Sequence, residues 1–558
     1  MVSRFPEQIA LSGSITLKRK LTRSAKVPVE PAGAARDQSR SWREPALRPR
    51  VRVAILVALV VTLTVAYWAV ERTISFNSDN ACVLLQAEDV AAGNLALRGW
   101  TLSNCSFYPE SSFYALALLL NHSARSLARE GPPFIYAIIV IIALWLTGRG
   151  VGDPARCAGY VITFLLIALP GSLQHLFIAP STHMSTLLLV LAAVVTLSFG
   201  EKPSDRPCAI YFIYIALMAF AVFGDLFAVY VGAIPVAAVA AYRWVQSRFS
   251  HTRELAVLAA TIVAVLIGNG SLEFVRAMGG FHIVPIDAHF VAMRSLRSNA
   301  WATIAGIAAL FGVSLEHGTA MPLGAILVLA RLAGLLFLLL CCSIAAHRTL
   351  RGTENRTNEI LLAVIALDVL EYLLSDRAEG LETLRYLTPL VLFGAILAGR
   401  VGNSLLRPTR GFYAALGLIS IAYLAGFSRL IIQPVQSAQK DSQLAQWLYQ
   451  HGLVSGYGDY WQSSIVTLES DGKVKVRAVG FNGRLIPYLW ESKDQWYSAK
   501  SGVSAPNFVV FENQKYLMDI FREVSAVRTL GKPSQTFQFQ TFTIMIWDHG
   551  KWLLGGTE

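Results

Sequence analysis

Carboxylates gather in the segment that follows the first long apolar run of the chain. Asp79 lies in the stretch FNSDNACVLLQAEDVAAGN over residues 76–94, and Glu110 lies farther along the same loop. A carboxylate can take the proton from an attacking hydroxyl, and His183 is a further candidate base. Arg385 stands at the head of a late apolar run, where its guanidinium could bind the phosphate of a leaving group. These residue types predict acid–base and phosphate chemistry in a single pocket.

The composition places these residues in a membrane protein. Of the 558 residues, 54% are hydrophobic and only 15% are charged, whereas soluble proteins average about 25% charged residues. A spanning helix needs about 20 mostly apolar residues, and we expect about eleven such helices. They lie near 53–70, 133–149, 155–172, 182–199, 207–223, 226–243, 255–271, 321–345, 357–375, 386–399 and 411–431. The predicted fold class is a polytopic α-helical membrane protein.

The basic residues predict how these helices are oriented. The loops on the cytoplasmic side, which carry arginines and lysines, lie at 149–156, 202–206, 243–253, 348–356 and 400–410. We therefore expect a disordered basic cytoplasmic tail over 1–50, a transmembrane domain over 51–431 and an outer location for 432–558. The net charge of +12 is then explained by the orientation of the helices in the membrane. We therefore expect membrane lipid as a partner and do not expect nucleic acid.

Residues 432–558 differ in composition from the apolar runs. Patterns over 473–479, 507–512 and 536–547 are typical of strands, and KDSQLAQWLYQHG is typical of a helix that ends at Gly452. We expect a small extracytoplasmic α+β domain. Its aromatic residues could stack on sugars or pack its core, and both uses stay open. These residues are Tyr457, Tyr460, Trp461, Trp490, Trp496 and Tyr497.

The first outer loop, residues 71–132, is long, and loops of that length are usually functional or disordered. Its stretch ACVLLQAEDVAAGNLAL has helical apolar spacing with Gly93 as a stop, and FYPESSFYALALLL predicts a second amphipathic helix near Pro109. Two helices on the membrane surface would hold Asp79 and Glu110 at one boundary between lipid and water. The alternative is that acidic residues are simply tolerated on this side, because the positive-inside rule counts only Lys and Arg.

Several of these stretches together resemble a known superfamily. A basic tail and a first span lead to an outer loop that opens with Asp79 and contains AEDVAAGN and FYPESSFYALALLL. RYLTPLVLFGAILAGR at 385–400 enters a late span, and an outer domain follows the last span. Over about residues 50–430 this layout resembles the GT-C superfamily of membrane glycosyltransferases, which includes protein mannosyltransferases and the aminoarabinose transferases of lipid A.

The resemblance implies an activity and a location. It implies transfer of a sugar from a polyprenyl-phosphate donor to a lipid, glycan or protein acceptor of the cell envelope, at the outer face of a bacterial cytoplasmic membrane. Asp79 would act at the acceptor as base or as the ligand of a divalent metal. The pattern departs from the family at Asn80, where a second acid is often found, and at His183 in APSTHMST, where the family often has a carboxylate.

Two further residues are candidates for substrate binding. Tyr386 follows Arg385 at the start of its span, and Asp225 follows Gly224 in a tight outer turn. Asp225 could instead be an ordinary turn residue. The segment IDAHFVAMRSLRS over 286–298 predicts an outer helix that covers the site as a lid or lies on lipid headgroups.

Other features leave different functions open. Asp368 and Glu371 share one face of a predicted span, where acidic residues are costly and often functional. They could serve a transporter or flippase, or could pair with Arg331 in a structural role. A non-catalytic assembly protein is a third reading. Cys82 and Cys105 share the outer loop, and both a disulfide and two free thiols are compatible with that location.

Overall fold

The structure is a computed structural model that describes most of the chain after the N-terminal tail. The described residues are 49–74, 76–120, 122–149, 153–171, 173, 175–178, 183–200, 207–285, 289–313, 322–378, 380–405, 409–432, 438–499, 502, 504–513 and 516–554. The tail expected over 1–50 thus lies almost wholly outside them. The chain divides into two units, Met1–Ala54 and Ile55–Glu558. Every helix and strand after α1 belongs to the second unit.

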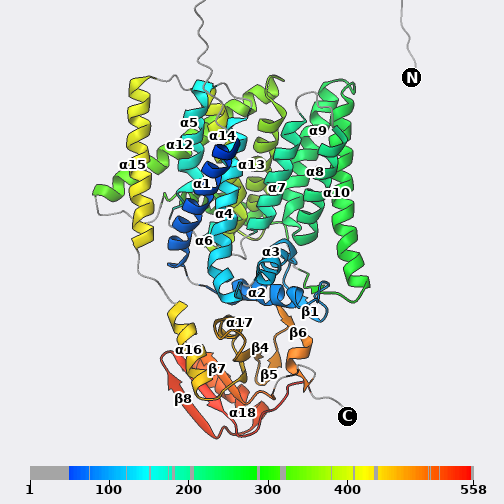
Figure 1. Ribbon diagram of the computed structural model, residues 1–558, viewed down its shortest axis with the longest axis vertical. Coiled ribbons are helices and arrows are strands. Elements are labelled where there is room, and N and C mark those ends of the chain that lie inside the picture. The colour runs from blue at the N-terminus through cyan, green and yellow to red at the C-terminus, as the bar shows by residue number, and fades with distance from the viewer. Residues whose placement is uncertain are drawn as a thin grey trace, which may run out of the picture. The chain divides into compact units, whose positions relative to one another are not determined.

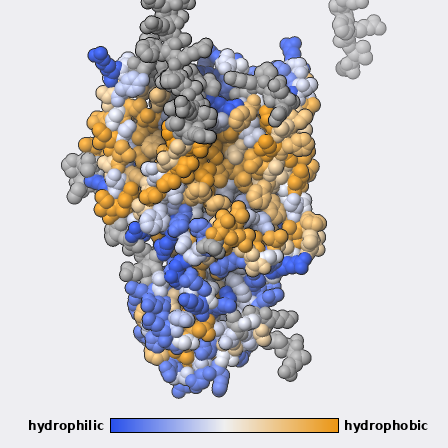
Figure 2. All heavy atoms as spheres, in the orientation of Figure 1, coloured by the Kyte–Doolittle hydropathy of each residue, from blue (hydrophilic) through white to orange (hydrophobic). Residues whose placement is uncertain are grey.

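Long apolar helices make up most of the second unit (Figure 1). In the described part of the chain, six helices are long and apolar enough to cross a membrane, and three shorter apolar helices accompany them. The long ones are Val53–Glu71, Ala124–Gly148, Thr252–Ala277, Gly324–Leu350, Thr383–Leu405 and Arg410–Ile432, and the shorter ones are Cys157–Ala168, Met184–Phe199 and Cys208–Gly224. Figure 2 shows apolar side chains gathered over these helices and hydrophilic ones over the C-terminal strands. The protein is therefore a polytopic membrane protein.

All eleven predicted runs fall on helical segments, although not all of these meet the length and charge limits of a span. The helices of this region are α1 (Pro49–Glu71), α4 (Ala124–Gly148), α5 (Asp153–Thr163) with the π-helix η1 (Phe164–Ala168), α6 (His175–Ile178), α7 (Met184–Phe199), α8 (Pro207–Gly224), η2 (Val229–Ala233) with α9 (Ile234–Gln246), α10 (Thr252–Ala277), α11 (Leu296–Leu310), α12 (Pro322–Leu350), α13 (Arg356–Leu374), η4 (Glu382–Leu387) with α14 (Thr388–Leu405), and α15 (Arg410–Ile432). The helix α13 carries Glu359, Asp368 and Glu371 within an apolar sequence.

The segment between α10 and α12 differs from the predicted outer loop. Residues 286–288 lie outside the described residues, Phe290 bridges to Ser375, and η3 (Met293–Ser295) leads into the apolar helix α11. The predicted helix over 286–298 is therefore wrong at 289–292 and holds from Met293, where the helical turn begins. Residues such as Ala308 and Leu310 are buried on the face of α11 that packs against its neighbours.

The two predicted surface helices of the first loop are present. α2 (Ser78–Ala91) begins at a capping box in which Asn77 and Asn80 exchange side-chain and backbone hydrogen bonds. It ends just before Gly93, whose φ of 100° suits the end of a helix. α3 (Tyr108–Leu119) begins with Pro109 in its first turn, where a missing N–H costs nothing.

The C-terminal segment folds around a six-stranded mixed sheet. The strands are β3 (Ser455–Gly458), β4 (Lys475–Phe481), β5 (Leu485–Pro487), β7 (Phe508–Glu512), β8 (Gln535–Phe539) and β9 (Phe542–Ile546), in the order β5-β4-β3-β7-β9-β8. β4, β3 and β7 are parallel, and the others are antiparallel to their neighbours. The stretch over 536–547, expected as one strand, is a hairpin that turns at Gln540 with a φ of 53°.

Helices cover both faces of this sheet. The strand β7 is a continuous apolar run, as expected of a strand that is buried on both sides. Phe508 and Val510 join the cluster of α16 (Ala438–Gln450), while Val509 and Phe511 join the opposite cluster, which includes Ala526 of α18 (Tyr516–Leu530). The predicted helix before Gly452 is α16, and Gly452 has a φ of 71°.

A second, small sheet joins three distant segments. β1 (Trp100–Leu102) of the first loop pairs in parallel with β2 (His282–Ile283), which follows α10. The same strand pairs antiparallel with β6 (Ser492–Lys493) of the C-terminal segment. Lys493 also binds Asp89 of α2 at 2.9 Å. The C-terminal segment is thereby fixed to the loop that carries the predicted site residues.

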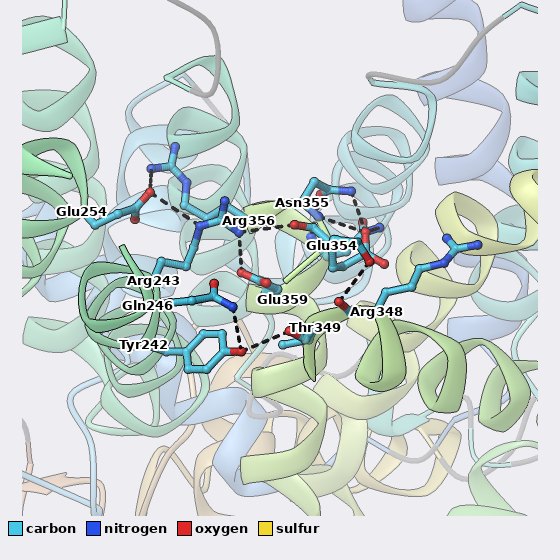
Figure 3. A network of polar contacts seen from close by, with 12 residues as sticks. Tyr242, Arg243, Gln246, Glu254, Arg348, Thr349, Glu354, Asn355, Arg356 and Glu359 are labelled. Carbon is cyan, nitrogen blue, oxygen red and sulfur yellow. Dashed lines mark hydrogen bonds and ion pairs between the residues drawn. The ribbon is translucent and has the colours of Figure 1, made fainter. Parts of the chain in front are cut away.

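A network of charges ties together the helix ends that the positive-inside rule assigns to the cytoplasm (Figure 3). Arg243 of α9 binds Glu359 of α13 at 2.7 Å and approaches Glu254 of α10 at 3.7 Å. Arg356 lies 3.6 Å from the same Glu254. Several basic residues of these loops thus face carboxylates of neighbouring helices, so part of their role is to hold those helices together.

Candidate active site

Asp79 lies in the first turn of α2, where its charge suits the positive end of the helix. Its Oδ1 accepts a hydrogen bond from the hydroxyl of Tyr460, the first residue of α17 (Tyr460–Glu469). The neighbouring Ser78 hydroxyl donates to the Tyr460 carbonyl at 2.5 Å. Burial raises the pKa of Tyr460, so the phenol stays protonated and acts as a donor. The C-terminal segment thus supplies the partner of the predicted base.

Arg385 lies in η4, directly before α14. Its guanidinium is within electrostatic range of Asp79 and of Cys105. One terminal nitrogen donates to the Tyr386 hydroxyl at 3.4 Å, whereas the buried Nε has no hydrogen-bond partner among the described residues. A buried cation with an unused donor is costly unless a ligand completes its shell. The arrangement therefore suits an anionic substrate group beside Asp79.

Glu110 is buried at the start of α3. Its Oε1 accepts the Ser185 N–H at 2.9 Å, and its Oε2 has no hydrogen-bond partner among the described residues. Burial raises the pKa of Glu110 to about 8, and the hydrogen bond from Ser185 offsets only part of that increase. At neutral pH this side chain is mostly protonated, so it suits a proton donor better than the base that the sequence suggested.

His183 and Asp225 form a buried pair. His183 precedes α7 with a φ of 62°, and its Nδ1 lies 2.5 Å from Asp225 Oδ2. Asp225 Oδ1 accepts the Phe227 N–H at 2.9 Å, as in an ordinary turn, while Thr186 donates to Oδ2 at 3.0 Å. Burial alone would raise the pKa of Asp225, but His183 and these hydrogen bonds outweigh it and lower the pKa. Asp225 therefore does more than an ordinary turn residue, because it also binds His183 and Thr186.

Tyr386 connects this pair to Arg385. Its ring lies 5.6 Å from the His183 ring and 5.9 Å from the Phe227 ring, measured between centroids. Its hydroxyl accepts from Arg385. The structure thus brings the six predicted site residues into one neighbourhood, with Asp79 and Arg385 on one side and the buried His183, Asp225 and Glu110 on the other.

Three residues of this neighbourhood were not predicted as site residues. Tyr460 was considered only for sugar stacking or core packing, and its contact with Asp79 depends on how the C-terminal segment docks. Glu491 accepts hydrogen bonds from the Ser103 N–H at 3.0 Å and from Gln86 at 2.5 Å. Cys105 lies within electrostatic range of Arg385, Asp225 and Glu110.

The structure also decides between alternatives that the sequence left open for the two cysteines and for Arg331. Cys82 and Cys105 are free thiols, and Cys82 instead donates to Ser464 at 3.1 Å. Arg331 lies over the Tyr423 ring and donates to backbone carbonyls such as that of Pro170, so the proposed pairing with Asp368 and Glu371 is wrong. Asp368 instead accepts the Leu390 N–H at 3.0 Å.

The residues around Asp79 do not favour the divalent metal that the resemblance gives as an alternative to the role of base. Asp79 Oδ1 is engaged by the Tyr460 hydroxyl, and the guanidinium of Arg385 is nearby. Among the described residues, the side chains that could hold a metal ion converge instead at Cys105, His183 and Asp225.

An apolar groove reaches from the helix surface toward this neighbourhood. Its volume is about 270 Å³, and it is lined by residues of α5, η1, α12 and α15, among them Leu166 and Tyr423. A smaller cavity shares Leu166 and Tyr423 with it, and a third shares Phe177 with the second and ends at Met184 and Thr388. Thr388 donates to the Arg385 carbonyl at 2.7 Å. The two smaller cavities hold only about 10 Å³ each, and the last of them is lined by Thr388, which contacts the Arg385 backbone.

Comparison with known proteins identifies the fold. No protein-family model and no curated protein sequence matches the chain. The chain is similar to the crystal structure of ArnT from Cupriavidus metallidurans bound to undecaprenyl phosphate, with 11% identity and a TM-score of 0.52, over 89% of this chain and 98% of that one. The apo structure of the same protein gives 12% identity and a TM-score of 0.38 over the same shares. The likeness to the first structure confirms the GT-C resemblance at the level of the fold.

Proposed function

We propose that this protein is a membrane glycosyltransferase that moves a sugar from a polyprenyl-phosphate donor to a cell-envelope acceptor. In this proposal about eleven helices span the bacterial cytoplasmic membrane, with the N-terminus inside. The C-terminal α+β domain and the first loop then face the outer side. Asp79, Arg385 and their neighbours would form the active site at that boundary between lipid and water.

The proposed reaction is a single displacement at the anomeric carbon. An acceptor hydroxyl forms the new carbon–oxygen bond and gives its proton to Asp79, while the bond from the anomeric carbon to the phosphate oxygen breaks. The electron pair leaves with the polyprenyl phosphate, whose charge Arg385 would stabilise. Because Tyr460 engages Oδ1, Oδ2 of Asp79 can accept the proton. A displacement of this kind inverts the configuration of the sugar.

One observation carries the proposal: the half-buried Arg385 keeps a buried, unused Nε–H donor within electrostatic range of Asp79. A phosphate would satisfy that donor and bring the anomeric carbon near a carboxylate base. The apolar groove of about 270 Å³ would take part of the isoprenoid tail. The fold is that of ArnT, a protein whose crystal structure holds undecaprenyl phosphate.

Substitution of both charged residues tests the proposal. Asp79→Asn and Arg385→Ala would be expressed in cells that lack the wild-type protein, and envelope glycans and lipids would be compared by mass spectrometry at equal protein levels. Loss of a general base lowers rates by roughly 10²–10⁴-fold, so the product should disappear with Asp79→Asn. Purified Arg385→Ala should also lose affinity for undecaprenyl phosphate, whereas Asp79→Asn should keep it.

Matched controls separate this effect from general damage. Asp494→Asn makes the same chemical change at an exposed position of the C-terminal segment, and Arg377→Ala removes an arginine near the start of η4. Both should keep the product. Full product with Asp79→Asn and with Arg385→Ala would refute the transferase.

A transporter or flippase is the second candidate function. The observation in its favour is the buried carboxylate of Asp368. Its Oδ1 is buried inside α13 and has no hydrogen-bond partner among the described residues. If substitution of Asp368 and Glu371 with Asn and Gln leaves uptake or flipping of an envelope substrate unchanged, that reading fails. A non-catalytic assembly protein is the third reading. In that case cells that carry Asp79→Asn should show the same envelope as cells that carry the wild-type protein.

A further inference from the structure

Three side chains with metal-binding atoms meet beside the proposed active site. The Cys105 thiol, a ring nitrogen of His183 and a carboxylate oxygen of Asp225 lie within 4.8 Å of one another. Each residue is at most 4% exposed. They come from the loop before α3, the residue before α7 and the residue after α8, so three separate segments converge there.

The backbone holds these segments in place. The N–H groups of Ser106 and Phe107 donate to the Gly224 carbonyl at 3.0 and 3.1 Å, which fixes the Cys105 loop on the end of α8. His183 adopts a φ of 62°, a conformation that non-glycine residues seldom take, and its side chain turns to Asp225 without capping α7. Strain of this kind persists where the surrounding structure enforces it, and it is common at functional sites.

The arrangement suits a metal better than a nucleophilic thiol. A catalytic cysteine needs a hydrogen bond to its histidine, but the Cys105 thiol donates instead to the Asn104 side chain at 3.5 Å. The surroundings also offer further oxygen atoms. The carboxyl groups of Glu110 and Glu491 are within electrostatic range of Cys105, as is the guanidinium of Arg385, and the buried Glu110 Oε2 has no hydrogen-bond partner among the described residues.

The donor atoms indicate which metal would bind. A thiolate, an imidazole and a carboxylate together form a typical Zn²⁺ ligand set, whereas Mg²⁺ and Mn²⁺ prefer oxygen ligands. Zinc binds sulfur at about 2.3 Å and nitrogen at about 2.0 Å. The thiol would therefore move slightly inward, and the 2.5 Å contact between His183 and Asp225 would open as both turn to the metal.

We propose that Cys105, His183 and Asp225 bind one Zn²⁺ ion, with water as the fourth ligand. Binding replaces the proton of the thiol and any proton shared by His183 and Asp225, and these protons pass to solvent. The metal would lock the loop before α3 to the ends of α7 and α8, next to Tyr386. This site is separate from the base Asp79 and does not depend on the reaction that the protein catalyses.

Metal binding to the full-length protein in detergent micelles tests this proposal. The metal-stripped protein would be incubated with Zn²⁺ and measured by elemental mass spectrometry, and incubated with Co²⁺ and measured by absorption spectroscopy. We expect about one equivalent of zinc per chain. We also expect a thiolate-to-cobalt charge-transfer band, which requires a sulfur ligand. Wild-type protein that binds no zinc, or binds cobalt without this band, would overturn the proposal.

Variants assign the ligands. Cys105→Ser should abolish the charge-transfer band, and Asp225→Asn should weaken zinc binding by at least about tenfold. His183→Asn should also weaken zinc binding by at least about tenfold. Asparagine is chosen because it tolerates the left-handed backbone conformation at this position. Cys82→Ser removes another buried thiol and should leave both signals intact. A band that persists in Cys105→Ser and disappears in Cys82→Ser would contradict the assignment. These measurements use no sugar donor or acceptor. Their outcome therefore does not depend on whether the protein is a glycosyltransferase.

Discussion

The hydroxyl of Tyr460 donates a hydrogen bond to the carboxylate of Asp79, although 381 positions separate the two residues. The first loop and the C-terminal domain therefore build the proposed active site together. The surrounding contacts are consistent with this, since β1 pairs with β6 and Cys82 donates to Ser464. The C-terminal domain is thus part of the proposed site, where it would hold the proposed base Asp79 in position.

Tyr460→Phe tests that role. The change removes one hydrogen bond to a charged group, which is worth about 1.5–3 kcal/mol, so the transfer rate should fall by about tenfold or more. Affinity for undecaprenyl phosphate should not change, because Arg385 is untouched. Tyr488→Phe is the matched control, since the Tyr488 ring contacts that of Tyr460 and is 41% exposed. Equal rates for the two variants would show that Tyr460 does not position Asp79.

Gly224→Ala should separate the two halves of the site. A Cβ at Gly224 would lie 2.1 Å from Cδ of Pro109, so α3 must move away from the end of α8. Overpacking of this kind typically costs about 1–3 kcal/mol. We expect a lower unfolding temperature and weaker transfer, because Glu110 and Asp225 lie on the two sides of this contact.

Gly270→Ala is the control for that experiment. A Cβ at Gly270, within α10, meets nothing within 4 Å, and alanine is favoured over glycine in helices by about 1 kcal/mol. The unfolding temperature should therefore stay the same or rise. If Gly224→Ala behaves in the same way, the close contact with Pro109 is not important for stability.

Ala333→Trp should block the apolar groove. Ala333 lines the groove on α12, and a large side chain there would compete with an isoprenoid tail. Affinity for undecaprenyl phosphate should fall several-fold, whereas affinity for the shorter farnesyl phosphate should change less. Leu329→Trp lies on the same helix at a 63% exposed position and should affect neither ligand. An unchanged affinity of Ala333→Trp for undecaprenyl phosphate would rule out the groove as the tail site.

The sequence predicted those parts of the protein that depend on local patterns. Apolar runs located the helices, and the end of α2 just before Gly93 follows from the preference for glycine after a helix, whereas its start at Asn77 was not predicted. Asp79, Arg385 and Tyr386 were predicted as site residues from their positions at helix ends and from the family resemblance, and the structure places them together.

The remaining features depend on contacts between distant segments. No local pattern shows that Tyr460 meets Asp79, or that Cys105 meets His183, because both contacts arise only when separate segments pack together. The hairpin at Gln540 was missed because no glycine, proline or asparagine marks the turn, although the alternating apolar positions shift in phase between Phe539 and Phe542. The carboxylates of Glu254 and Glu359 were overlooked because the positive-inside rule counts only basic residues.

The buried Glu491 should make the stability of the folded protein depend on pH. The side chain is 4% exposed, and burial raises its pKa to about 7, whereas an unfolded glutamate has a pKa of about 4.3. The folded protein therefore keeps this proton at pH values where the unfolded chain has lost it. The resulting stabilisation is fully present below about pH 4.3 and is lost as the pH rises to about 7.

Glu491→Gln should remove this dependence, because the amide stays neutral and can still accept the Ser103 N–H. The unfolding temperature in micelles would be measured at pH 5 and pH 8 for both proteins. We expect a smaller decrease for the variant than for the wild type, and Glu523→Gln, on α18, should follow the wild type. Other buried acids contribute equally to all three proteins, so the difference between the curves reports Glu491. Parallel curves for wild type and Glu491→Gln would mean that this carboxyl does not titrate on unfolding.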